Sequence, residues 1–333
     1  MTRTPRPPRI VRWLACAQQL LGQAAPRLNA LNVFPVPDAD TGSNMHATMA
    51  AAHAAAADAA EASTDIGATL ERAGAAALSS ARGNSGTLLA VMVAGMADPL
   101  RDQESLTAPS LAEALLRADT AARTALSDPR EGTILSVLGA ARASVQACVR
   151  SAFDEGRDTR TRAVLEEAVA GAVRDARAAV QQTEGQLDEL TRAAVVDAGA
   201  VGLLLVLEAL RAVMLDAAPQ TSLTDGLRGY ADGVAVAASG PEGGVEVMCT
   251  IELDPLGAAT LRHRLTEVGD SVIVAPTRRG DDPQDIVPWR VHVHVPRAPL
   301  AEDLFREVGN PRDVQVTDLT DERGGHDHTH GEH

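Results

Sequence analysis

The sequence predicts a mainly α-helical domain followed by a small α/β domain. First, the apolar residues are mostly Ala, Val and Leu, with only 2% aromatic residues. This composition is typical of closely packed helices, because Ala lets helix axes approach one another. Second, residues 8–215 show helical patterns with short polar or glycine-containing interruptions and no convincing strand. Third, apolar and polar residues alternate in short segments beyond residue 243, as in strands.

About eight helices are expected in the first domain, residues 1–215. The Ala-rich stretch 47–62 is helical by intrinsic propensity. Ser110 and Glu113 have the spacing of a capping box, which places a helix start there. The expected helices lie near residues 9–25, 44–61, 65–80, 85–97, 110–126, 132–151, 161–182 and 199–215.

The chain changes character in residues 216–243, where Pro, Gly and Ser predict a linker. The second domain, residues 244–320, is expected to be a small α/β unit. Its predicted strands and helices are residues 245–253, 256–267, 271–275, 290–295 and 300–308. Residues 321–333 are rich in Gly, His and Asp, so we expect a disordered tail with incidental affinity for divalent metal.

Composition excludes several classes of function. The net charge of −15 argues against a nucleic-acid groove, which needs clustered cations, and so few aromatic residues provide no stacking platform. The chain contains no lysine, so it cannot form a Walker A loop. Any phosphate chemistry must therefore use metal, backbone amides, hydroxyl groups and arginine.

The chain shows no sign of export or of membrane insertion. Its three cysteines, Cys16, Cys148 and Cys249, are too widely spaced to indicate a disulfide framework. The basic N-terminal segment is a poor signal peptide, and no stretch approaches a membrane span. We therefore expect a cytoplasmic protein.

Two carboxylates, Asp38 and Asp40, follow the stiff sequence of residues 34–37, Phe-Pro-Val-Pro. Such a pair offers the hard oxygen ligands that Mg²⁺ prefers, shared with phosphate oxygens and water. Residues 41–44 come where a helix should begin, and a helix N-terminus favours an anion. Taken alone, the pattern fits an Asx-rich turn that caps a helix better than it fits a metal site.

The flanking residues favour the metal site over the simple turn. Asn32, residues 34–37 and the segment Asp38-Ala39-Asp40-Thr41-Gly42 resemble the signature of the dihydroxyacetone-kinase ATP-binding-subunit family, in the form found in its bacterial fatty-acid-kinase branch. Three further segments are similar to later motifs of this family and follow in the same order: residues 81–86, 131–135 and 196–202.

The resemblance implies a fold and a set of site residues. The fold would be an eight-helix antiparallel barrel that binds ATP or ADP at one end. Asp38 and Asp40 would be the catalytic pair that holds Mg²⁺, with Asn32 as a neutral third ligand. The residues expected to contact the nucleotide are Thr41, Gly42, Ser43, Asn44, Met45, Ser79, Ser80, Gly83, Asn84, Thr133, Asp197 and Gly199.

Several of these residues also have ordinary structural explanations. Met45 is a typical core residue, and Ser79 and Ser80 could cap the next helix. Gly83 could simply break one helix and start another.

A second metal site is a hypothesis for the small domain. His292 and His294 lie two apart on a predicted strand and so share a face, and Cys249 lies on an earlier strand. One thiolate and two imidazoles suit Zn²⁺, although the spacing alone fits ordinary strand residues better. Residues 248–250, 269–274 and 291–295 resemble the middle domain of the fatty-acid kinases, in which a cysteine and a His-x-His pair are metal-associated. With this resemblance, the zinc site and the interpretation as ordinary strand residues are equally well supported.

The sequence departs from the family pattern in three places. Ala39 stands where a glycine is usual, so we expect the turn to avoid positive φ. Residues 198–200, Ala-Gly-Ala, replace a more glycine-rich run. Fatty-acid kinases also continue into a C-terminal domain that engages a fatty-acid-carrying partner, which implies that the acceptor comes from another chain.

Three functions remain open at the level of sequence. The first is an Mg-ATP-dependent kinase component that transfers the γ-phosphate to an acceptor on a fatty-acid-binding or phosphocarrier-like partner. The second is a nucleotide-binding regulator or scaffold without turnover. The third is a metal-binding interaction protein whose second domain forms a homodimer.

Overall fold

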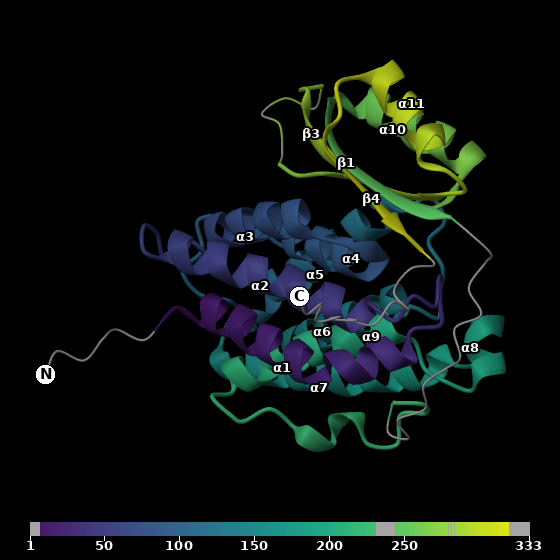
Figure 1. Ribbon diagram of the computed structural model, residues 1–333. Helices are drawn as coiled ribbons and strands as arrows, with labels where there is room; N and C mark the ends of the chain where they lie inside the picture. Colours follow the sequence, from purple (N-terminus) through teal and green to yellow (C-terminus); the bar gives the residue numbers. More distant parts are fainter. Residues whose placement is uncertain (1–6, 231–243, 279, 281, 283, 320–333) are drawn as a thin grey trace, which may run out of the picture.

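The computed structural model describes residues 7–230, 244–278, 280, 282 and 284–319. It confirms the predicted fold class, because a helical domain occupies the first two thirds of the chain and a small sheet with two helices follows (Figure 1). No helix in the described part of the chain combines the length and apolar character needed to cross a bilayer. The predicted tail, residues 321–333, lies outside the described residues, as do residues 231–243 of the predicted linker.

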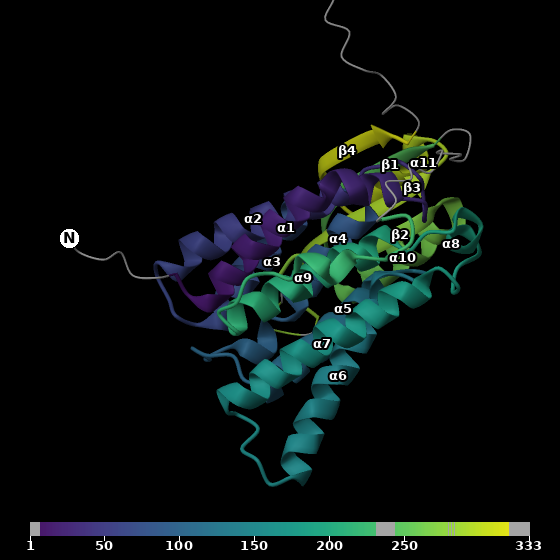
Figure 2. The same ribbon diagram turned by 90° about the horizontal axis from the view of Figure 1, so that it is seen from below.

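Eight long helices form a closed ring in the helical domain. Each contacts the next along the chain, and the last contacts the first, which confirms the predicted barrel. Figure 2 shows α1, α2 and α9 running side by side. The helices are α1 (Arg9–Leu31), α2 (Thr41–Ala60), α3 (Ile66–Ser80), α4 (Gly83–Gly95), α5 (Ala108–Ala125), α6 (Ile134–Asp154), α7 (Arg162–Thr183) and α9 (Ala198–Met214).

Short elements complete this domain. They are α8 (Asp188–Ala193) and the 3₁₀ turns η1 (Asp98–Leu100) and η2 (Thr221–Thr224). Every residue of α9 is buried, as expected for a helix that packs against several others. Residues 216–230 of the predicted linker also pack on the helical domain, where Leu223, Leu227 and Tyr230 are buried. Glu208 of α9 holds this segment by accepting a 2.7 Å hydrogen bond from the Gln220 amide.

The capping box predicted from Ser110 and Glu113 is wrong. Thr107 caps α5, and Ser110 returns the second hydrogen bond of the box. Glu113 instead pairs with Arg117 one turn further along, at 3.0 Å. The start of α5 therefore lies two residues before the predicted one, because Pro109 fits within the first turn of a helix.

The small domain is a four-stranded antiparallel sheet in the order β2-β3-β1-β4. Its strands are β1 (Val245–Leu253), β2 (Asp270–Pro276), β3 (Val287–Val295) and β4 (Arg312–Asp318). The helices α10 (Pro255–Val268) and α11 (Ala298–Val308) cover the face that points away from the helical domain (Figure 1).

The other face of the sheet packs on the helical domain. Ile273 and Ala275 of β2 belong to the core of the helical domain, whereas Val272 and Val274 belong to the separate core under α10 and α11. The backbone of β2 also pairs with the segment after α5, where the Ser127 amide donates a 3.1 Å hydrogen bond to the Val272 carbonyl. Because successive side chains of a strand point to opposite faces, β2 contributes residues to both cores.

Candidate functional site

Asp38 and Asp40 meet in the turn before α2 and share a hydrogen bond. Asn32 donates a side-chain hydrogen bond to Asp38, and Asn44 donates one of 2.6 Å to Asp40. Burial, together with the negative charge of Asp40, raises the pKa of Asp38 to about 8. Burial also raises the pKa of Asp40. The two half-buried groups would repel one another if both were ionised, so a divalent cation would stabilise the fully ionised pair.

The turn itself contradicts one expectation. Ala39 adopts φ 59°, in the left-handed region that alanine was expected to avoid. The strain of a Cβ in this region is of order 1–2 kcal/mol. The turn keeps this conformation because the two flanking carboxylates are fixed by Asn32 and Asn44.

The N-terminus of α2 is not a free set of amides. Asn29, in the last turns of α1, accepts hydrogen bonds from the amides of Gly42 at 2.8 Å and Ser43 at 3.1 Å. Its own amide donates to the Ser43 hydroxyl at 2.9 Å. No sequence pattern marks this role of Asn29, because the cap comes from another helix rather than from the motif.

The start of α4 lies directly against this turn. Gly83 has φ 59°, and a Cβ on it would come within 2.5 Å of Asn44 Nδ2 and 3.8 Å of Asp40 Oδ1. No side chain caps α4, and the buried Oδ1 of Asn84 has no hydrogen-bond partner among the described residues. Positive φ and close approach both explain why Gly83 is a glycine.

The third and fourth motifs reach the same end of the barrel. Asp197 caps α9 by accepting a 2.7 Å hydrogen bond from the Ala200 amide, and it also accepts one from the Ile134 amide at the start of α6. Burial raises the pKa of Asp197 to about 7. Thr133 caps α6 by accepting from the Leu135 amide at 3.3 Å. A Cβ on Gly199 would lie 3.4 Å from the hydroxyl oxygen of Ser85.

The structure therefore brings the starts of α2, α4, α6 and α9 together, with Asp38, Asp40, Asn44, Gly83, Asn84, Thr133, Asp197 and Gly199. The core explanation fits Met45, which is fully buried against Gly202 of α9. Ser79 and Ser80 are exposed in the last turn of α3, so they do not cap α4. Asn32 is a hydrogen-bond donor to Asp38, and its role as a third Mg²⁺ ligand remains a prediction.

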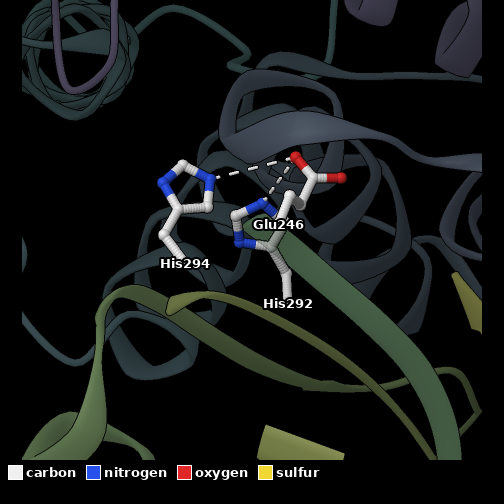
Figure 3. A group of neighbouring side chains, drawn as sticks. All are labelled: Glu246, His292 and His294. Atoms are coloured by element: carbon white, nitrogen blue, oxygen red, sulfur yellow. Dashed lines mark ion pairs between the residues drawn. The ribbon is translucent and has the colours of Figure 1, made fainter. Parts of the chain in front are cut away.

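A second cluster lies on the sheet face that packs on the helical domain. Glu246 of β1 and His292 and His294 of β3 form it, and all three are buried (Figure 3). His292 Nε2 is 3.2 Å and His294 Nε2 is 3.9 Å from the same oxygen, Glu246 Oε2. Burial disfavours the ionised glutamate, but the two imidazoles hold the pKa of Glu246 below its usual value. Burial lowers the pKa of His294.

The donor set of this cluster fits a divalent metal. His292 Nδ1 donates a 3.0 Å hydrogen bond to the Ser271 carbonyl, and its Nε2 faces Glu246 Oε2 at 3.2 Å. A backbone carbonyl on the second ring nitrogen is the usual support of a metal-bound histidine. Neither ring nitrogen of His294 has a hydrogen-bond partner among the described residues, and the same holds for His292 Nε2. Two imidazoles and a carboxylate are a common ligand set for Zn²⁺.

Cys249 does not belong to this cluster, which corrects the predicted ligand set. It pairs with Val291 across the strands and points into the core under α10 and α11. Its neighbour Met248 pairs with His292 instead. Because alternate residues of a strand face opposite sides, Glu246 shares the face of the histidines and Cys249 does not. Burial raises the pKa of the Cys249 thiol to about 12, as expected for an inert core cysteine.

The two clusters lie within electrostatic reach of each other across the domain interface. The negative charge of Glu246 raises the pKa of Asp40, and the charge of His292 lowers it. The face of the sheet that carries this cluster packs on the helical domain, and β3 contacts α4, whose first residues lie against the acidic turn.

Comparison with known proteins agrees with this architecture. A family model described as the DAK2 domain matches residues 35–212, which is more than half of the chain. The chain belongs to the DAK2 domain family. A second model, described as the FakA-like middle domain of fatty acid kinase, matches residues 242–325. In this DAK2 protein the first match lies within the helical domain, from the turn before α2 to the last turn of α9, and the second covers the sheet domain.

Individual relatives are similar over the same region. Protein YloV of Bacillus subtilis is 35% identical over 199 residues, which cover 59% of this chain and 33% of YloV. An uncharacterized protein of Staphylococcus saprophyticus is 34% identical over 188 residues, covering 56% of this chain and 32% of that protein. The chain therefore matches about a third of the length of each of these relatives.

One similar solved structure is the dihydroxyacetone kinase from C. freundii in complex with AMP-PNP and Mg²⁺. It covers 63% of this chain and 36% of its own, with 20% identity and a TM-score of 0.43.

Proposed function

We propose that this DAK2 protein is the Mg-ATP-binding component of a phosphotransferase, whose acceptor is presented by a partner protein. The observation that carries this proposal is the convergence of Asp38 and Asp40 with the starts of four helices. Membership in the DAK2 family and the match to a fatty-acid-kinase middle domain support the same reaction class.

Asp38 and Asp40 would hold Mg²⁺, which would neutralise charge on the phosphate oxygens during transfer. The chain's own residues prepare this site. Asn32 and Asn44 orient the two carboxylates by donating hydrogen bonds to them. The uncapped start of α4, with its positive end, lies beside them and suits the phosphates of a nucleotide. Asn84 Oδ1, which has no hydrogen-bond partner among the described residues, would accept from a ribose hydroxyl.

Glu246, His292 and His294 would form the acceptor side of the site. They face the barrel end from the sheet and act electrostatically on Asp40. We assign to them a divalent metal, with Zn²⁺ as the ion that suits their donor atoms. Bound there, such a metal would supply a positive charge opposite the nucleotide site.

The test is calorimetric titration of the purified chain with ATP in the presence and absence of Mg²⁺. Wild type should bind ATP with a strong dependence on Mg²⁺, and the double substitution Asp38→Asn/Asp40→Asn should lose this dependence. Asp58→Asn, on the exposed side of α2, is the matched control and should bind like wild type. Absence of nucleotide binding by the folded wild type would overturn the proposal.

The same samples distinguish a kinase component from a nucleotide-binding regulator. A kinase component should consume ATP when a cognate acceptor protein is added. A regulator should bind ATP with the same Mg²⁺ dependence and leave it intact under all partner conditions.

A further inference from the structure

A separate cavity of about 580 Å³ lies between the two domains. Helices α3, α4 and α5 form one side of it, and α10 with β2 and β3 forms the other. Its volume is within the range of about 300–1,000 Å³ that is usual for small-molecule sites. None of the nucleotide-site or metal-cluster residues described above lines it.

The walls of this interdomain cavity are mainly apolar. Small side chains of α4 and α5 leave the space open, and Trp289 of β3 is its aromatic wall. The apolar wall residues include Leu78, Val91, Ala94, Ala121, Val274 and Trp289. An interior of this kind favours an apolar body over a nucleotide or a sugar.

Four arginines and two acidic residues, Glu71 and Asp98, line the cavity, which is therefore more basic than the chain as a whole, whose net charge is −15. Arg101 is already paired with Glu71 at 3.0 Å, and Arg117 is paired with Glu113 at 3.0 Å.

Two further arginines line the cavity on the side of the small domain. Arg262 of α10 donates to the backbone carbonyl of Thr124, and Arg278 follows β2. Within the described residues, neither has a carboxylate partner. Their charges are therefore available to a ligand, whereas those of Arg101 and Arg117 are already offset.

We propose that this cavity binds an amphipathic anion, with its apolar body between the domains and its carboxylate or phosphate head group at Arg262 and Arg278. Charge-assisted hydrogen bonds from two guanidinium groups are a strong and specific way to hold such a head group. Because both domains line the cavity, the ligand would stabilise their packing. Trp289 precedes His292 by three residues, about 10 Å along β3, so the ligand would contact the same strand that carries the two histidines.

Trp289 makes the site directly measurable. The chain has two tryptophans, and Trp13 is buried in the helical core, so Trp13→Phe leaves emission from Trp289 alone. In this background we would titrate palmitate, hexadecyl phosphate and hexadecanol below their aggregation concentrations. At least one anion should change the emission saturably, and the uncharged alcohol should bind more weakly. The comparison of palmitate with hexadecyl phosphate identifies the head group.

Arg262→Gln/Arg278→Gln should weaken anion binding by about tenfold or more, since it removes both charge-assisted hydrogen bonds to the head group. Arg150→Gln/Arg160→Gln, which lies outside the cavity, should have no effect. Ala121→Phe should block the apolar part, with its thermal unfolding midpoint confirming that it folds.

Three outcomes would overturn the site: no anion changes the emission, hexadecanol binds as tightly as the anions, or the arginine double variant binds like wild type. Calorimetry with Mg-ATP on the same variants is independent of these results, because the cavity shares no residue with the nucleotide site.

Discussion

The half-buried Asp38/Asp40 turn and the buried Glu246/His292/His294 cluster both hold carboxyl groups, but the pKa is raised in the first and lowered in the second. In the turn, burial and a second carboxylate act in the same direction and raise the pKa of Asp38 to about 8. In the cluster, burial again opposes ionisation, but two imidazoles hold the pKa of Glu246 below its usual value. The sign of the neighbouring charge, more than the depth of burial, decides whether each carboxyl group is protonated or ionised.

The two sites also differ in how the chain assembles them. Asp38 and Asp40 are two residues apart, so a single turn brings them together. Glu246 and the histidines lie on different strands, and the pairing of Glu246 with His294 determines their contact. One site is thus specified by local sequence and the other by sheet register.

The largest expected effect is on Zn²⁺ affinity, which should depend on one face of the sheet and not on the other. His292→Ala should weaken Zn²⁺ binding by about 100-fold or more, because structural zinc sites bind with about 10–16 kcal/mol shared among their ligands. Cys249→Ala should leave Zn²⁺ affinity unchanged, because Cys249 faces the opposite core. Competition with a chromophoric chelator measures both affinities. Loss of binding in the cysteine variant alone would show that Cys249, and not the histidine face, points at the metal.

Asp197 extends the comparison to a carboxyl group whose pKa is shifted by burial rather than by a neighbouring charge. Burial raises its pKa to about 7 from an ordinary value of 3.8. The unfolded chain therefore loses this proton at a lower pH than the folded chain, so the group lowers stability progressively as pH rises from about 4 to 7.

Asp197→Asn should remove this penalty and keep the cap of α9, since Asn is an equally good N-cap residue. Relative to wild type, the variant should gain about 3 kcal/mol in free energy of unfolding between pH 5 and pH 8, at about 1.4 kcal/mol per pKa unit. Urea unfolding at the two pH values measures the gain. A difference between the two proteins that does not change with pH would contradict it.

Much of the fold could be read from the sequence. Periodicity and propensity located all eight long helices, and β1 has the predicted bounds, Val245–Leu253. In contrast, β4 was missed because every one of its residues is exposed and its alternation of Val with polar residues is short. Such an edge strand is fixed by pairing with β1 rather than by burial.

In the candidate site too, some residues could be predicted from the sequence and others could not. The family resemblance implied that Asp38, Gly83 and Asp197 lie at one end of the barrel. The ring of helices explains this placement, because alternate helices of an antiparallel ring start at the same end. Asn29 and Glu246 were missed, since their roles depend on contacts between separate elements. Neither a cap that comes from another helix nor a metal ligand whose position depends on strand pairing has a characteristic spacing in the sequence.

A matched glycine pair tests whether the close approach of α4 matters to the acidic turn. Gly83→Ala should lower the free energy of unfolding by about 2 kcal/mol, from left-handed strain and the disturbed bond of Asn44 with Asp40. It should also weaken Mg-ATP binding. Gly156→Ala has similar strain at φ 71° but no atom within 4 Å, so it should lose only about 1 kcal/mol and bind nucleotide normally. Equal nucleotide affinity in the two variants would contradict the proposed role of the contact between α4 and the acidic turn.

The smallest expected effect concerns the left-handed alanine between the two aspartates. Ala39→Gly should raise the free energy of unfolding by about 0.5–1 kcal/mol, because relief of about 1–2 kcal/mol of strain exceeds the added entropy of the unfolded chain. Ala194→Gly, at φ 56° in the cap of α8, should gain by a similar amount. Ala62→Gly, after α2 and without positive φ, should lose stability. Chemical denaturation ranks the three. If Ala39→Gly behaves like Ala62→Gly, the turn holding Asp38 and Asp40 is not left-handed, and the geometry of the acidic pair must be redrawn.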